Sequence, residues 1–137
     1  MKIGDVMDQV AAQLASIPQL SGRVFAYPPG SVVPPAAVVS YPDQLIFDET
    51  YGRGMDRLTL PVMVMVGRPT ERSTRDHLEV FCEGSGPSSV KATVEQGAYS
   101  AFHTVRVEGI EFDVVTMGGN DYMTALFTLD IAGSGTA

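Results

Sequence analysis

The sequence predicts an α+β fold, with two to three helices packed on a mixed, mostly antiparallel sheet of about five to six strands. One observation is the order of hydrophobic periods: a helical period, then strand segments, then two helical periods, then alternation to the end. The other is size, since 137 residues with 45% hydrophobic and 18% charged side chains suit one core. Residues 1–137 are therefore treated as one domain, with a small, polar tail at 133–137 expected to fray.

The first predicted element is an amphipathic helix over residues 3–17. Its apolar residues recur at three- and four-residue spacing, which places them on one face. They are Ile3, Val6, Met7, Val10, Leu14 and Ile17. Pro18 ends the pattern, because proline lacks the N–H that a continuing helix would need.

A proline-rich stretch over 27–43 follows, and it contains a wholly apolar run at 36–40 that suits a short buried strand. A hairpin is then predicted between strands 44–48 and 57–66. The connection contains Tyr51-Gly52-Arg53-Gly54, where glycine takes positive φ at little cost.

The strand at 57–66 has two apolar faces along its second half. One face carries the alternating Leu58, Leu60, Val62, Val64 and Val66. The other ends in Pro61, Met63 and Met65, which is too apolar to stand in water, so a helix of the same chain or a neighbouring subunit is expected to cover it. Pro61 cannot donate to a ladder and marks an edge position or a bulge.

The remaining pattern predicts two helices and three strands. The helices are expected at 70–82 and, after the break at Gly84-Ser85-Gly86-Pro87, at 88–95. The strands are expected at 102–108, 110–116 and 122–132, with turns at Gly109 and at 118–121.

Charge and cysteine content exclude several classes of function. The net charge is −7, and no basic cluster is denser than Arg68, Arg72 and Arg75, so a nucleic-acid-binding face is not expected. The single Cys82 excludes an intramolecular disulfide and reads as a buried, inert thiol. Without a signal peptide pattern or an apolar run long enough to span a bilayer, the chain is expected in a reducing, aqueous compartment and not in a membrane.

No catalytic, cofactor or metal site is predicted. His77 and His103 have no carboxylate or nucleophile at a suggestive spacing. Ser88-Ser89-Val90-Lys91 matches the S-x-x-K of serine acylases, but the partner motifs are absent and a serine cap at Ser88 explains the pattern better.

The glycine pairs around Ser85 and Arg53 lack the spacing of phosphate-binding loops and read as turns. Arg53 is then either a plain exposed arginine or a contact residue at the hairpin tip. The carboxylates form no calcium loop or metalloprotease motif, and they lie scattered along the chain. They are Asp43, Asp48, Glu49, Glu108, Glu111 and Asp113.

Taken together, these segments resemble a known family over roughly residues 5–132. The resemblance rests on Leu14-Ala15-Ser16-Ile17-Pro18, Pro34-Pro35-Ala36-Ala37-Val38-Val39, Thr50-Tyr51-Gly52-Arg53-Gly54-Met55-Asp56, Val66-Gly67-Arg68, the helix at 71–81 and Gly84-Ser85-Gly86-Pro87-Ser88-Ser89-Val90-Lys91. The pattern is similar to that of the tail terminator proteins of long-tailed (siphovirus-type) actinobacterial phages.

This resemblance implies a structural virion protein, assembled in the host cytoplasm, and not an enzyme. Such proteins form a ring, usually of six subunits, that caps the head-proximal end of the tail tube and stops its polymerisation. The implied partners are further copies of the chain, the major tail tube protein and a head-closure or neck protein. DNA would pass through the channel without specific binding, which suits the acidic balance.

From the alternation and the glycine-flanked loop, subunit contacts are expected at Tyr51, Arg53, Met63 and Met65. Burial of both methionines under the chain's own helices is the competing explanation. A head-closure or other neck protein is the alternative within the same class. A small-ligand-binding or enzymatic α+β domain is the alternative from a different class, and a deep pocket holding His77 or His103 beside carboxylates would favour it.

Overall fold

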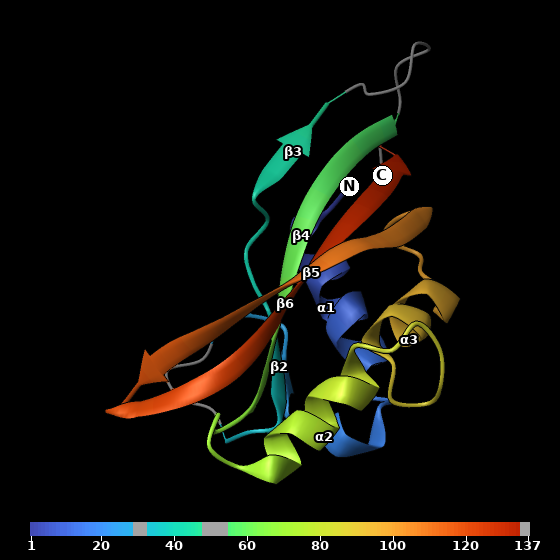
Figure 1. Ribbon diagram of the computed structural model, residues 1–137. Coiled ribbons are helices and arrows are strands. Elements are labelled where there is room, and N and C mark those ends of the chain that lie inside the picture. Colours follow the sequence, from blue (N-terminus) through green and yellow to red (C-terminus); the bar gives the residue numbers. More distant parts are fainter. Residues whose placement is uncertain (29–32, 48–54, 135–137) are drawn as a thin grey trace.

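The computed structural model describes residues 1–28, 33–47 and 55–134, and it confirms the predicted α+β class (Figure 1). Three α-helices, one short 3-10 helix and a six-stranded sheet make up this part of the chain. In chain order the elements are α1 (Ile3–Leu14), η1 (Pro18–Leu20), β1 (Val24–Phe25), β2 (Ala36–Val39), β3 (Gln44–Ile46), β4 (Met55–Gly67), α2 (Arg72–Phe81), α3 (Val90–Gln96), β5 (Thr104–Met117) and β6 (Asn120–Ser134).

Two long strands, β4 and β6, form the centre of the sheet. The strand order is β1-β2-β4-β6-β5, and β3 pairs with β4 beyond the end of β2. The β1–β2 pair is parallel and all other pairs are antiparallel. Because β6 follows β4 along its whole length, β2 and β3 share the opposite edge of β4.

The helices pack on one face of this sheet, as Figure 1 shows. The core joins the apolar face of α1 and residues of α2 and α3 to the alternating side chains of β4 and β6. Val6, Val10 and Leu14 of α1 have no exposed surface, and neither do Leu60 of β4 and Phe127 of β6. At about 25 cal/mol per Å² of buried apolar area, this layer is the main source of stability.

The hairpin between β3 and β4 is confirmed, with Leu45 opposite Leu58. Pro61 lies where the edge of β4 passes from β2 to β3. Its carbonyl accepts a hydrogen bond from the Ser40 N–H at 3.0 Å, and the chain then leaves β2 towards β3. Proline has no N–H to donate at this position. The neighbouring strand is interrupted here, between β2 and β3, so no ladder hydrogen bond is lost.

The C-terminal third differs from the prediction. The segments at 102–108 and 110–116 belong to one strand, β5, and Gly109 is not a turn. The pairing with β6 shifts between Val107 and Gly109, which is a β-bulge that leaves the strand continuous. The turn at 118–121 is confirmed, since Gly118 and Gly119 have φ of 59° and 82° in a two-residue hairpin loop. The two-residue strand β1 was not predicted.

Helix ends also shift. α1 ends at Leu14, and a 3-10 turn begins at Pro18. α2 begins at Arg72 and not at residue 70. The cap of α3 is Ser89 and not Ser88: the Ser89 hydroxyl accepts a hydrogen bond from the Ala92 N–H at 3.1 Å.

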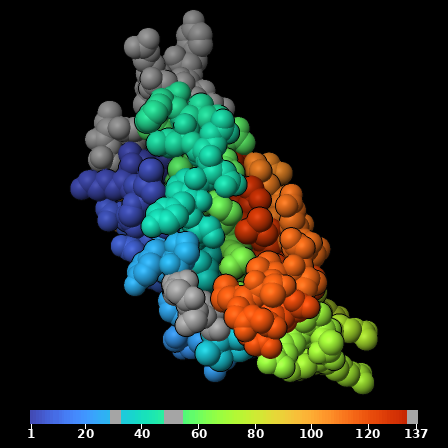
Figure 2. Space-filling view, turned by 90° about the vertical axis from the view of Figure 1, so that its left-hand side faces the viewer, coloured from blue at the N-terminus to red at the C-terminus, as the bar shows by residue number. Residues whose placement is uncertain are grey.

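The face of the sheet opposite the helices is apolar near β2. Figure 2 shows this side of the molecule, with β3 in teal and the β5–β6 hairpin in orange. Ala36, Val38 and Met65 are buried here, although none of them belongs to the helix-packed core. Of the two covers expected for this face, a helix of the same chain does not cover Met65: its side chain is buried within the chain on the face that the helices do not occupy.

Candidate subunit interface

The structure gives the four predicted contact residues different positions. Tyr51 and Arg53 lie outside the described residues. Met65 has no exposed surface and in this conformation offers no area to a second subunit. Met63, half-buried, lines a hollow of about 210 Å³ with Glu111, Asp113 and Leu126 on the face opposite the helices. The predicted set therefore does not form one surface within the described residues.

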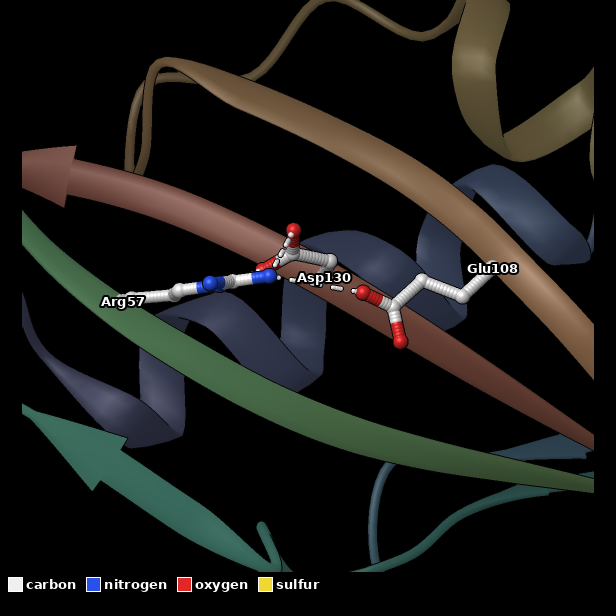
Figure 3. Close-up of polar contacts among 3 residues, drawn as sticks. All are labelled: Arg57, Glu108 and Asp130. Carbon is white, nitrogen blue, oxygen red and sulfur yellow. Dashed lines mark hydrogen bonds and ion pairs between the residues drawn. The ribbon is translucent and has the colours of Figure 1, made fainter.

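An ion-pair cluster occupies the same face, nearer the start of β4 (Figure 3). The Arg57 guanidinium donates to both Asp130 carboxylate oxygens, at 2.6 and 2.8 Å, and lies 3.5 Å from a Glu108 oxygen. These three side chains come from β4, β6 and β5, so the cluster ties three strands together. The Arg57 side chain is 40% exposed, and the contribution to stability is modest at such a solvent-accessible position.

The edge strand β5 is divided by its bulge into two parts with different surroundings. Before the bulge, α3 covers the strand: the Glu95 carboxylate accepts a hydrogen bond from the Val107 N–H at 2.9 Å and pairs with Lys91. Partial burial raises the pKa of the Glu95 carboxyl, but these hydrogen bonds outweigh it and hold the pKa below its ordinary value. An exposed N–H of the edge is thereby occupied.

Beyond the bulge, the helix-side face of β5 is uncovered. Ile110, Phe112 and Val114 lie opposite Phe127, Ala125 and Met123 of β6, so they continue the apolar face of the sheet. Phe112 and Val114 are nevertheless 54% and 48% exposed.

A groove of about 390 Å³ lies beside this uncovered row. It separates Phe112 from Leu78 of α2 and from Cys82, the residue directly after this helix, and Arg75 and Glu79 also line it. Burial raises the pKa of the Cys82 thiol to about 11, which keeps it protonated near neutral pH. An apolar groove next to an unpaired strand edge is typical of a protein-binding surface.

A second hollow, of about 420 Å³, lies between the N-terminal half of α2 and the segment before β2. Its polar lining includes Arg68, Glu71, Thr74, His77 and Tyr122. The ring of His77 packs against Phe81, with centroids 6.2 Å apart, and no hydrogen bond joins it to Glu71 in the described part of the chain. The hollow thus holds a histidine and a carboxylate without a formed acid–base pair.

The other residues singled out for chemistry have separate partners. The Ser88 hydroxyl donates to Gln19 at 2.9 Å, whereas Lys91 pairs with Glu95, so the two members of the S-x-x-K pattern do not meet. His103 is exposed and lies directly before β5. Among the described residues, no group of three or more His, Cys, Asp or Glu side chains could hold a metal ion. No helix in the described ranges has the length and apolar character needed to cross a membrane.

Sequence reasoning missed the exposed Phe112 and Val114, although the alternation of 110–116 was recognised. Alternation tells which residues share a face of a strand. It does not tell how far the helices extend over that face. The length of the strand relative to the short α3 is the signal that could have identified them.

The comparisons with known proteins leave the family open, since no protein-family model matches the chain and a search of curated proteins found no match.

Proposed function

We propose that this protein is a structural tail terminator, which assembles with copies of itself into a ring at the head-proximal end of a phage tail tube. The main observation that supports self-assembly is the pair of uncovered apolar side chains, Phe112 and Val114, on an edge strand. Monomeric proteins blunt such edges with charge, proline or a covering helix. Here α3 covers the part before the bulge, and the part beyond it carries the exposed Glu111 and Asp113 but leaves the apolar Phe112 and Val114 uncovered. An open remainder is expected where a neighbouring subunit supplies the cover.

Charge supports the same proposal. A net charge of −7 opposes retention of DNA, as a ring around a DNA channel requires. The tail terminator assignment itself rests on the resemblance described above, together with this capacity for assembly. A head-closure or other neck protein would show the same physical features.

The deciding experiment is to remove the gene from its parent phage and to measure tail length by electron microscopy. Abnormally long tubes without heads are the expected result, because nothing then stops tube polymerisation. Tails of normal length that fail to join heads would reassign the protein to the neck. Normal infectious particles would refute both structural roles.

The hollow that holds His77 and Glu71 favours a second candidate, a small-ligand-binding or enzymatic domain. A ligand that raises the melting temperature of the wild type, and not of His77→Ala, would support this candidate. We prefer the structural role because the histidine ring packs against Phe81 and is not paired with the carboxylate.

A further inference from the structure

The hollow of about 420 Å³ beside α2 adjoins the first turn of that helix. Ser73 and Thr74 line it from the helix and Glu71 from the N-cap position, while Gly67 and Arg68 line it from the end of β4 and the loop that follows. The short connection between β4 and α2 therefore places a helix N-terminus beside this hollow.

The first N–H groups of α2 have no hydrogen-bond partner among the described residues. Glu71, at the N-cap, makes no side-chain cap, and the first N–H of the helix to bond back is that of Thr74, which donates to the Glu71 carbonyl at 3.2 Å. The N–H groups of Arg72 and Ser73 are left available. A helix N-terminus with free N–H groups carries partial positive charge and favours an anion.

A buried hydroxyl in the same turn also lacks a partner. Thr74 is 4% exposed, and no hydrogen bond joins its side chain to another residue of the described chain. Since no fully enclosed side-chain oxygen of the described residues is unpaired, this hydroxyl opens onto the hollow that Thr74 lines. It points towards Gly67, where a Cβ would lie 2.5 Å from the Thr74 Oγ1. A polar group held in a buried position and facing an open hollow is suited to a polar ligand.

Arg68 adds a full positive charge to the lining. Its guanidinium lies 3.3 Å from the side-chain oxygen of Asn120, which is neutral, and no carboxylate in the described ranges pairs with it. A guanidinium, free helix N–H groups and a hydroxyl form a donor set that binds oxyanions, phosphate among them.

The carboxylate of Glu71 also lines the hollow and narrows the choice of anion. Two anionic groups at one site repel each other unless a proton lies between them. A phosphate group has its last pKa close to neutral pH and so brings a proton that it can donate to a carboxylate. Sulfate has no such proton. The mixed lining therefore favours phosphate over sulfate.

We infer that the hollow at the start of α2 binds a phosphate group, either inorganic phosphate or the phosphate of a small phosphomonoester. The helix N–H groups, Arg68 and the Thr74 hydroxyl donate to its oxygens, and Glu71 accepts from its proton. At about 420 Å³ the hollow is within the size range of small-molecule sites, so both sources fit. This site goes beyond the proposed ring assembly and does not depend on it.

The test is calorimetric titration of the full-length protein with inorganic phosphate, near neutral pH, in a phosphate-free buffer of constant ionic strength. A dissociation constant of about 1 mM is expected for one small anion. Sulfate should bind at least ~10-fold more weakly, because the Glu71 carboxylate receives no proton from it.

Thr74→Val removes the hydroxyl, keeps the shape of the side chain and should weaken phosphate binding roughly 10-fold. Because the hydroxyl has no protein partner, this variant should melt at or above the wild-type temperature when phosphate is absent. Thr93→Val is the matched control, since Thr93 is also buried, at 8% exposed, but lies in α3 and does not line the hollow. It should bind phosphate as the wild type does.

Two charge variants complete the test. Arg68→Gln should weaken phosphate binding roughly 10-fold, whereas Arg75→Gln removes the same charge from a part of α2 outside the hollow and should leave binding unchanged. Glu71→Gln should allow sulfate to bind as well as phosphate does, because the repulsion is gone.

No heat of binding and no rise in melting temperature at tens of millimolar phosphate would overturn the inference. Equal affinities of the wild type and Thr74→Val, or an equal loss in Arg68→Gln and Arg75→Gln, would overturn it too. None of these results bears on tail length or self-association, so the proposed function is tested separately. Tighter binding of glycerol phosphate than of inorganic phosphate would identify the ester as the ligand, and the reverse order would identify the free ion.

Discussion

At the level of single residues, Ser89 sets the start of α3. It has no exposed surface, its hydroxyl accepts from the Ala92 N–H, and it donates to the Glu83 carbonyl. The neighbouring Ser88 makes one hydrogen bond, to Gln19. The sequence pattern indicated a serine cap here, but the choice between adjacent serines depends on which one faces the loop after α2.

Ser89→Ala should therefore destabilise the fold by about 1 to 2 kcal/mol, because a helix cap is lost and the Glu83 carbonyl loses its donor. Urea unfolding followed by circular dichroism measures this. Ser88→Ala is the matched control and should cost clearly less. Equal losses for the two variants would show that the cap is not the cause.

Glu95 makes the free energy of unfolding depend on pH in the acid range. Its pKa is lowered in the folded chain from an ordinary value of 4.5, so its contribution is complete above that value and is lost as the pH falls through the folded pKa. Glu95→Gln should accordingly reduce the free energy of unfolding most near neutral pH, and the gap to the wild type should shrink below pH 4.5. Urea titrations at several pH values test this. Glu79→Gln, on the exposed side of α2, controls for loss of a carboxylate, and the same narrowing there would contradict the assignment.

At the level of elements, the β5–β6 hairpin depends on its two-residue turn. Gly118 and Gly119 have φ of 59° and 82°, a backbone conformation that is strained for residues other than glycine. A Cβ at Gly119 would meet no atom within 4 Å, so backbone conformation alone decides the effect of a substitution. The sequence identified this turn correctly because two adjacent glycines between alternating segments are a strong hairpin signal.

Gly119→Ala should cost about 1 to 2 kcal/mol of stability. Gly84→Ala is the control, since a Cβ there also meets no atom within 4 Å and its φ is not in the left-handed region. It should change stability by less than ~0.5 kcal/mol in either direction. A loss at Gly84 as large as that at Gly119 would mean that the turn conformation is not responsible.

At the level of the whole molecule, the Arg57 cluster links β4, β6 and β5 on the face away from the helices. Arg57→Ala should lower stability by about 1 kcal/mol or less, because the pair is accessible to water and ions. The difference from the wild type should diminish when unfolding is measured in high salt. A loss that is unaffected by salt would point to packing by the arginine stem instead.

The sequence sufficed for the fold class, the three helices and the long strands β4 and β6, because their hydrophobic periods reflect which face meets the core. It did not suffice for the joining of 102–108 with 110–116: a glycine between alternating segments fits a turn or a bulge equally well. It left the cover of Met65 open between a helix of the same chain and a neighbouring subunit, since what buries a second apolar face depends on sheet curvature and on segments distant in sequence. The exposure of Phe112 and Val114 was not predicted, for the same reason.

The strand order has a consequence for synthesis. β6, the last strand of the described chain, lies between β4 and β5, so Leu58 and Leu60 reach their partners Ile131 and Leu129 only when that segment is available. A nascent chain on the ribosome holds β4 and the helices without the strand that completes their core. The apolar face of β4 therefore lacks its cover until residues 120–134 have been synthesised, and chains cut short before residue 120 should be cleared by cellular proteases and not accumulate as partial domains.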